Sequence, residues 1–216
     1  MLATPTVSIS NTPTAICDGN LVLFDGTANT SAPSNITLYR WTFGTADTLR
    51  VEDTSYRFPN TGIYNVQFLA VNNLGCSAVV SKNITVNPNP DARLFRSIAC
   101  NNQLTQFKDS SIVIGSGNII NQWGWDFTGD GIIDSTSQHP RFNFTTPGVY
   151  KTKLTVTTNN GCSNTDSLTT TVNFTPIINF SPVSNSLCLN DTFTFNNTSI
   201  GAFAFGWDMG RSEERR

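Results

Sequence analysis

The sequence predicts an all-β protein in which one β-sandwich unit is repeated in tandem, and three observations lead to this fold class. First, a cysteine followed seven residues later by a phenylalanine occurs three times, beginning at Cys17, Cys100 and Cys188. Second, apolar residues alternate with polar ones along several segments, which is typical of strands with one buried face. Third, no segment shows the sustained i, i+3, i+4 apolar spacing of an amphipathic helix. Self-similarity at a fixed period indicates an array of one structural unit.

A tryptophan marks the middle of each repeat. An aromatic residue lies two positions before each of Trp41, Trp125 and Trp207, and these three tryptophans follow one another at a nearly constant spacing. In an immunoglobulin-type sandwich, one tryptophan per unit fills the core. We therefore predict a strand around each of these tryptophans, with the indole ring directed into the core.

The second half of the repeat aligns without a gap between the first two units. In each, a Gly-X-Tyr sequence opens an alternating segment, and a Gly-Cys pair follows at the same distance from the tyrosine. The alternation predicts a long strand with one buried face. The tyrosine at its start resembles a tyrosine corner, in which the hydroxyl bonds back to nearby backbone. These positions are Tyr64 and Cys76 in the first unit, and Tyr150 and Cys162 in the second.

Further strands are predicted at residues 6–10, 20–25 and 77–86, with glycine-containing turns between them. About seven short strands separated by turns every eight to twelve residues indicate a Greek-key sandwich of immunoglobulin type. The fold class is therefore all-β, as tandem immunoglobulin-like sandwiches.

The repeats divide the chain into two complete sandwiches, at residues 1–88 and 89–174, and an incomplete third repeat at 175–216. We expect the third repeat to be poorly packed, because it lacks the strands that would cover its aromatic residues. The joints Asn87–Pro90 and Asn173–Pro176 are short and contain proline. Proline fixes its own φ and restricts the residue before it, so these linkers should limit bending.

Composition excludes several classes of function. Only 13% of the residues are charged and the net charge is −2, so the chain offers no basic surface for nucleic acid. No apolar run approaches the length of about 20 residues that a membrane-spanning helix needs, and we expect no membrane insertion. His139 is the only histidine, and no nucleophile–base motif or set of metal ligands accompanies it. The sequence therefore predicts that the chain is not an enzyme.

Met1–Pro5 lacks the features of a signal peptide, so we expect any export signal to lie outside this sequence.

Two motifs resemble a known family. Trp125–Gly131 reads Trp-Asp-Phe-Thr-Gly-Asp-Gly and Pro147–Tyr150 reads Pro-Gly-Val-Tyr, which resembles the signature of the polycystic kidney disease (PKD) domain. The first unit keeps Thr61–Tyr64 but has Thr42 in place of the motif aspartate. The resemblance implies immunoglobulin-like sandwiches in the extracellular part of a large protein. The cysteine-bearing variant is similar to tandem repeats of bacterial surface adhesins, typical of Bacteroidota that use the type IX export route. It implies a stalk, adhesive or binding role and no catalysis.

Two cysteines in each complete unit indicate disulfides in an exported protein. One scheme pairs them within units, as Cys17–Cys76 and Cys100–Cys162. In an immunoglobulin-type sandwich these positions lie at opposite ends of a strand about 25 Å long, whereas a disulfide needs Cα atoms within about 7 Å. The second scheme joins the lower end of one unit to the upper end of the next, as Cys17–Cys162, and leaves Cys76, Cys100 and Cys188 for neighbouring units. Free thiols are the third alternative, and the residues alone leave all three open.

One cluster has the spacing of metal ligands: Asp126, Thr128, Asp130 and Asp134. Side-chain oxygens at these intervals resemble the first part of a calcium loop. The twelfth position, where such a loop carries a bidentate glutamate, is Ser137, and the cluster follows a strand rather than a helix. The alternative interpretation is a hairpin in which the aspartates cap backbone amides. The sequence therefore predicts no cofactor, with calcium as the one alternative that the spacing allows.

We therefore expect a non-catalytic, extracellular module that serves as a stalk or adhesion segment of a large secreted or surface protein. The alternative is an accessory carbohydrate- or protein-binding module of a secreted hydrolase. The expected partners are neighbouring repeats of the same polypeptide and a glycan or protein ligand, met by the variable loops at 26–35, 44–53 and 110–122. Trp123 would stack on a sugar if exposed, but it takes the place of Tyr39, which favours packing in or beside the core.

Overall fold

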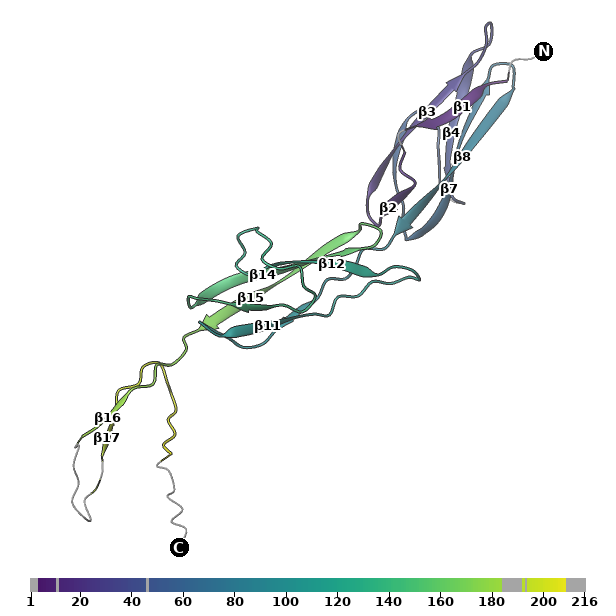
Figure 1. The fold of residues 1–216 in the computed structure, drawn as a ribbon. Helices are drawn as coiled ribbons and strands as arrows, with labels where there is room; N and C mark the ends of the chain where they lie inside the picture. Colours follow the sequence, from purple (N-terminus) through teal and green to yellow (C-terminus); the bar gives the residue numbers. More distant parts are fainter. Residues whose placement is uncertain (1–3, 11, 46, 184–191, 193, 209–216) are drawn as a thin grey trace.

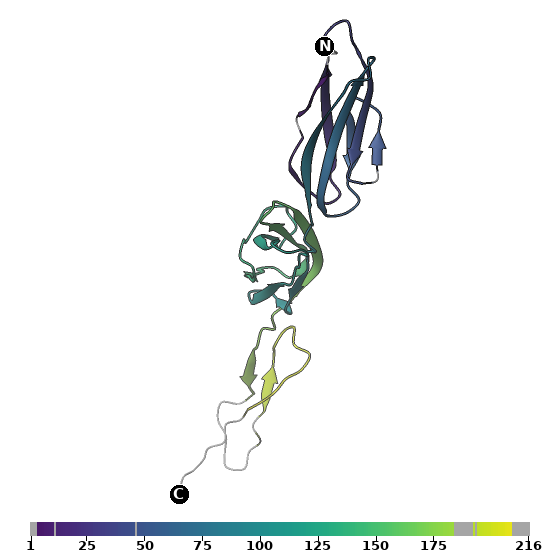
Figure 2. The ribbon, with the colours of Figure 1, turned by 90° about the vertical axis from the view of Figure 1, so that its right-hand side faces the viewer.

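The computed structural model describes residues 4–10, 12–45, 47–183, 192 and 194–208. Within these residues the chain forms strands, turns and loops, and no helix. Two β-sandwiches and a C-terminal hairpin follow one another end to end (Figures 1 and 2). The first sandwich lies at one end, the hairpin at the other, and the second sandwich between them. The protein is therefore a linear array of units, as the period of the sequence predicts. In the described part of the chain, no helix has the length and apolarity needed to cross a membrane.

The first sandwich consists of a three-stranded and a five-stranded sheet. Strand pairing is antiparallel, except that the short β2 runs parallel to β8. The smaller sheet has the order β1 (Thr6–Ser10), β3 (Leu21–Asn29), β6 (Thr54–Arg57). The larger sheet has the order β2 (Ala15–Cys17), β8 (Ser77–Asn87), β7 (Gly62–Asn72), β4 (Ile36–Phe43), β5 (Asp47–Leu49).

The second sandwich repeats this plan, including a short parallel pair, β10 with β15. One sheet has the order β13 (Arg141–Asn143), β11 (Leu104–Asp109), β9 (Leu94–Arg96). The other has the order β10 (Ala99–Cys100), β15 (Ser163–Asn173), β14 (Gly148–Thr158), β12 (Ile120–Asp126). The C-terminal hairpin pairs β16 (Phe180–Pro182) with β17 (Phe195–Asn197).

Each sandwich has its own hydrophobic core, and the predicted tryptophan lies at its centre. Trp41 and Trp125 are both 0% exposed. Each indole N–H donates to a backbone carbonyl, from Trp41 to Glu52 at 2.9 Å and from Trp125 to Ser137 at 2.9 Å. A buried indole is costly unless its N–H has a partner. In both units the partner lies between the tryptophan strand and the next strand of the opposite sheet, β6 or β13.

The tyrosine corner is present in both sandwiches. The Tyr64 hydroxyl donates to the carbonyl of Asn60 at 3.0 Å, and the Tyr150 hydroxyl donates to the carbonyl of Thr146 at 3.0 Å. Both tyrosines pack partly against the cores. The bond closes the turn before β7 or β14 and fixes where that long strand begins. These strands in turn place the Gly-Cys turn at the far end of each unit.

The C-terminal hairpin has the poor packing expected of the third repeat, and its tryptophan is therefore not the core residue that its position in the repeat predicts. Trp207, expected as a core residue, is 44% exposed. Its ring lies 5.2 Å from Phe195 and 5.3 Å from Phe180 between centroids, so a small aromatic cluster forms. In the first sandwich, β7 and β8 complete the sheet beside the tryptophan strand, and no such strands occur between Pro176 and Asp208 in the described part of the chain. The indole therefore remains partly open to solvent.

Candidate functional site: the junction between the sandwiches

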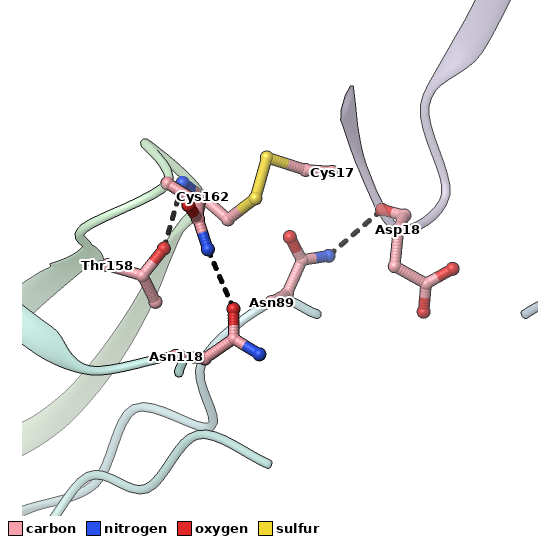
Figure 3. The surroundings of a disulfide bond; sticks show 7 residues. Cys17, Asp18, Asn89, Asn118, Thr158 and Cys162 are labelled. Carbon is pink, nitrogen blue, oxygen red and sulfur yellow. Dashed lines mark hydrogen bonds between the residues drawn. A yellow bond between two sulfur atoms is a disulfide. The ribbon is translucent and has the colours of Figure 1, made fainter. Parts of the chain in front are cut away.

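A disulfide joins the two sandwiches. Cys17, at the end of β2, is bonded to Cys162, in the turn between β14 and β15, with 5.5 Å between the Cα atoms (Figure 3). This is the second of the two pairings considered above. The pairing within units does not occur, because Cys76 and Cys100 are free and each lies at the opposite end of its sandwich from its supposed partner. Cys188 lies outside the described residues.

The first sandwich holds Cys17 through its backbone. Cys17 lies opposite Asn87 in the parallel pair of β2 and β8. The amide of Asp18 donates to the carbonyl of Asn87 at 2.8 Å, and the side chain of Asn89 donates to the carbonyl of Asp18 at 3.0 Å (Figure 3). The residue after the cysteine is thus tied both to the end of β8 and to the linker. The sulfur is fixed relative to the point where the second sandwich begins.

The second sandwich holds Cys162 in a tight turn. The amide of Thr158 donates to the carbonyl of Cys162 at 2.8 Å, and the amide of Cys162 donates to the Thr158 hydroxyl at 3.2 Å (Figure 3). Gly161 has a φ of 80°, a conformation that glycine adopts without strain. Cys162 is 0% exposed. The turn therefore presents its sulfur in one direction, toward the first sandwich.

The linker crosses a crevice of about 340 Å³ between the units. Ile63 and Val86 of the first sandwich, Pro88 of the linker and Ile114 of the second sandwich contribute apolar walls. Backbone, hydroxyl and amide groups complete the lining, and no ionisable side chain takes part. The crevice therefore offers no ionisable side chain that could act as a general acid or base. The loop at 110–122, one of those expected to meet a ligand, contributes Ile114 and its neighbours to this joint.

The aspartate cluster after β12 forms a capped hairpin. Asp126 is 4% exposed and accepts hydrogen bonds from the amides of Gly129 at 2.6 Å and Gly131 at 3.0 Å. Asp130 and Asp134 likewise accept from the backbone amides of Ile132 and Phe127. Thr128 has a buried hydroxyl that makes no hydrogen bond. In the described part of the chain, no three acidic, histidine or cysteine side chains gather as a metal site would require. The geometry favours the hairpin interpretation over the calcium loop.

Two buried carboxylates distinguish the second sandwich electrostatically. Burial raises the pKa of Asp126, but the amides of Gly129 and Gly131 and the nearby Lys153 ammonium outweigh it, so the pKa is lowered. Burial also raises the pKa of Asp109, but hydrogen bonds from Ser111, Trp123 and Gln138 outweigh it, and this pKa is lowered as well. Hydrogen bonds to the charged form account for both directions.

These pKa shifts predict that acid weakens the second sandwich more than the first. A carboxyl whose folded-state pKa is depressed contributes stability above its unfolded pKa of about 3.9, and this stability is lost as pH falls through the folded pKa. The first sandwich has Gly26 and Thr42 at the positions of Asp109 and Asp126. Hydrogen exchange, corrected for intrinsic rates, should show protection of β11–β15 falling first between about pH 5 and pH 3. With Asp109→Asn and Asp126→Asn together, the two sandwiches should lose protection in parallel; an unchanged difference would refute the assignment.

The remaining candidate residues serve the fold. Trp123 is half-buried beside the core, and its indole N–H donates to Asp109 at 2.8 Å. Because the ring packs against the core, its faces are only partly available, which does not favour the sugar-stacking role. His139 is exposed, and its Nδ1 accepts a hydrogen bond from the amide of Asp109 at 3.2 Å. It holds the loop before β13 and has no catalytic partner among the described residues.

Two immunoglobulin-like sandwiches of the same plan, joined at their ends, define a tandem modular protein. A family model described as PKD domain matches residues 2–88 and again 85–172. The chain belongs to the PKD domain family, with two copies in tandem.

Three solved bacterial structures are among those similar to parts of this chain. The fibronectin(III)-like modules of Clostridium thermocellum CbhA are 13% identical, with a TM-score of 0.42, over 78% of this chain and 95% of that chain. The PKD1 domain of Vibrio anguillarum Epp is 27% identical, with a TM-score of 0.36, over 41% of this chain and 99% of that one. The PKD1 domain of the Vibrio cholerae metalloprotease PrtV is 30% identical, with a TM-score of 0.35, over 39% and 98%. No curated protein matches the chain.

Proposed function

We propose that this chain is a non-catalytic stalk segment of a secreted or cell-surface protein, which holds an adhesive or otherwise functional part at a distance from its anchor. The observation that carries the proposal is the Cys17–Cys162 disulfide between the sandwiches. A disulfide within a unit would stabilise that unit alone. A disulfide between units fixes their relative placement, which is what a stalk must maintain.

Three further features of the junction support a stiff connection. The linker Asn87–Pro90 contains two prolines, each with a fixed φ. Asn89 is bonded to Asp18 of the first sandwich. At the other end of the linker, the carbonyl of Pro90 accepts a hydrogen bond from the side chain of Asn164 at 2.9 Å. The linker is therefore attached to both units along its length, unlike a flexible tether.

The disulfide also supports an extracellular location. Disulfides form and persist in oxidising compartments and are rare where thiols are kept reduced. The low charge and the abundance of short strands and turns suit a surface repeat. The accessory-module alternative has less support, because Trp123, its expected ligand-stacking residue, packs partly buried against the core.

The proposal predicts that the two sandwiches tumble as one body only while the disulfide is intact. In ¹⁵N relaxation measurements, amides of both sandwiches in the oxidised chain should fit a single rotational diffusion tensor. In a Cys17→Ser/Cys162→Ser variant, each sandwich should acquire its own, shorter correlation time. A Cys76→Ser/Cys100→Ser variant is the matched control, since it also removes two cysteines but should keep the single tensor. Unchanged joint tumbling without the disulfide would argue against a role of this bond in stiffness.

A further inference from the structure

The two free cysteines occupy the same positions in the repeat as the two bonded ones. Cys100 in the second sandwich corresponds to Cys17 in the first, and Cys76 in the first corresponds to Cys162 in the second. The junction thus uses the lower cysteine of one unit and the upper cysteine of the next. Each sandwich has one further half of such a junction, at the end that faces away from the other sandwich.

The surroundings of Cys100 reproduce those of Cys17 bond by bond. Cys100 lies opposite Asn173 in a parallel pair, as Cys17 lies opposite Asn87. The amide of Asn101 donates to the carbonyl of Asn173 at 2.9 Å, which matches the Asp18–Asn87 bond at 2.8 Å. The residue two positions further along the linker, Thr175, donates to the carbonyl of Asn101 at 2.5 Å, as Asn89 donates to that of Asp18 at 3.0 Å.

The surroundings of Cys76 reproduce those of Cys162 in the same way. The amide of Asn72 donates to the carbonyl of Cys76 at 3.0 Å, and the amide of Cys76 donates to the Asn72 side chain at 2.9 Å. Thr158 makes both bonds in the second sandwich. Gly75 has a φ of 79°, against 80° for Gly161. The turn that contains Cys76 therefore has the same geometry as the turn that orients the bonded sulfur of Cys162.

The free cysteines cannot bond to each other within one chain. Cys76 lies directly before β8, whose 11 residues separate it from the junction by about 36 Å. Cys100 lies at the far end of the second sandwich, beside Asn173. Both are partly exposed, so each is accessible to a partner from outside.

We propose that Cys76 and Cys100 are attachment points for further units of the same kind, so that disulfides between successive units run along the array as a ladder. Cys100 would bond to the Gly-Cys turn of a following PKD-type sandwich, and Cys76 to the lower cysteine of a preceding one. This inference rests on the proposed stalk function. The same surface could meet a unit of the same polypeptide or of another one.

The bond forms by thiol–disulfide exchange with a small-molecule or enzyme disulfide. The Cys100 thiol loses its proton, and the thiolate attacks the oxidant disulfide to give a mixed disulfide and one released thiol. The partner thiolate then displaces the second thiol. Two protein thiols and one oxidant disulfide thus become one protein disulfide and two released thiols.

The test is a chain in which residues 175–216 are replaced by a second copy of residues 89–174, which keeps the spacing from Asn173 to the next Asn-Pro. Each sandwich has a separate core, so the added copy carries all that it needs to fold. The protein is refolded in a glutathione redox buffer, alkylated without reduction and mapped by mass spectrometry. We expect a Cys100–Cys162 linked peptide beside the Cys17–Cys162 one, with two alkylated cysteines per chain instead of four.

Cys100→Ser in the first copy alone is the matched control and should abolish the Cys100–Cys162 peptide. If Cys100 remains fully alkylated while the Cys17–Cys162 bond forms, the ladder is refuted and the proposed stalk function is not. The absence of both bonds would instead remove the basis of the stalk function. Oxidation of the unchanged chain at high concentration distinguishes the two sources of the partner. Cys76–Cys100 bonds between copies would show that another polypeptide can supply the partner cysteine. If these bonds are absent and the extended chain forms its Cys100–Cys162 bond, the partner cysteine belongs to the same polypeptide.

Discussion

Stretching the oxidised chain from its two ends is expected to release roughly 500 Å less contour length than stretching the reduced chain, at about 3.5 Å per extended residue. The Cys17–Cys162 bond spans a sequence separation of 145 residues, and these residues account for the difference. A pull on the termini passes from Cys17 to Cys162 through the bond, so the chain between them bears no load. That chain contains every strand of the first sandwich after β2 and every strand of the second before β15.

Single-molecule force spectroscopy measures this difference directly. In the oxidised protein, only residues before Cys17 and after Cys162 can be extended, so β1, β2 and β15 can be peeled away while the rest stays enclosed. Addition of a reductant should produce two separate unfolding events, one for each sandwich. Cys17→Ser should behave as the reduced protein without any reductant, and Cys76→Ser/Cys100→Ser as the oxidised one. Full extension of the oxidised wild-type chain would show that the bond does not carry the load.

The sequence predicts the parts of this fold that depend on local patterns. Alternation around Trp41 and Trp125 predicts buried indoles, and the Gly-X-Tyr sequence predicts the corners made by Tyr64 and Tyr150. Both patterns report which face of a strand is buried, which the neighbouring residues determine. The short parallel strands β2 and β10 are not predicted, because two or three residues are too few to show a period.

The junction depends on information that one sequence does not carry. Repeat alignment places Cys17 and Cys76 at opposite ends of a unit, but which sulfur faces Cys162 depends on how the two sandwiches are placed. That placement comes from contacts such as Asn89 with Asp18, which leave no pattern in the sequence. The aspartates after β12 are ambiguous for another reason, because the same spacing of carboxylates can bind a cation or cap the backbone amides of a turn.

Gly26→Val is expected to destabilise the first sandwich by about 3 kcal/mol, as overpacking of a rigid core does. Gly26 lies on β3 with its missing side chain directed into the core. A Cβ atom there would lie 2.7 Å from Phe68 Cζ and 2.8 Å from Trp41 Cζ2. Both rings are 0% exposed and packed against one another at 4.5 Å between centroids, so neither can move aside without displacing its neighbours.

The second sandwich shows how a side chain can be accommodated at this position. It has Asp109 in place of Gly26, and Leu154 in place of Phe68. Leucine is smaller than phenylalanine, and the Asp109 carboxylate accepts the indole N–H of Trp123 at 2.8 Å. The two sandwiches thus combine glycine with phenylalanine and aspartate with leucine at the same pair of positions, which predicts that the two positions are coupled.

A double-mutant cycle tests this coupling. Gly26→Ala alone should cost about 1–3 kcal/mol through overpacking, and Phe68→Leu alone should cost about 1 kcal/mol through lost burial. The double variant should be more stable than the sum of the two predicts, by at least about 1 kcal/mol, because the leucine vacates the space that the new methyl group needs. Urea unfolding in a Cys17→Ser/Cys162→Ser background, followed by hydrogen exchange in each sandwich, separates the two units. The second sandwich, with Trp125 at its centre, is the control and should unfold at the same urea concentration in every variant. If the two substitutions lower the free energy of unfolding of the first sandwich additively, Phe68 is not what excludes a side chain at position 26.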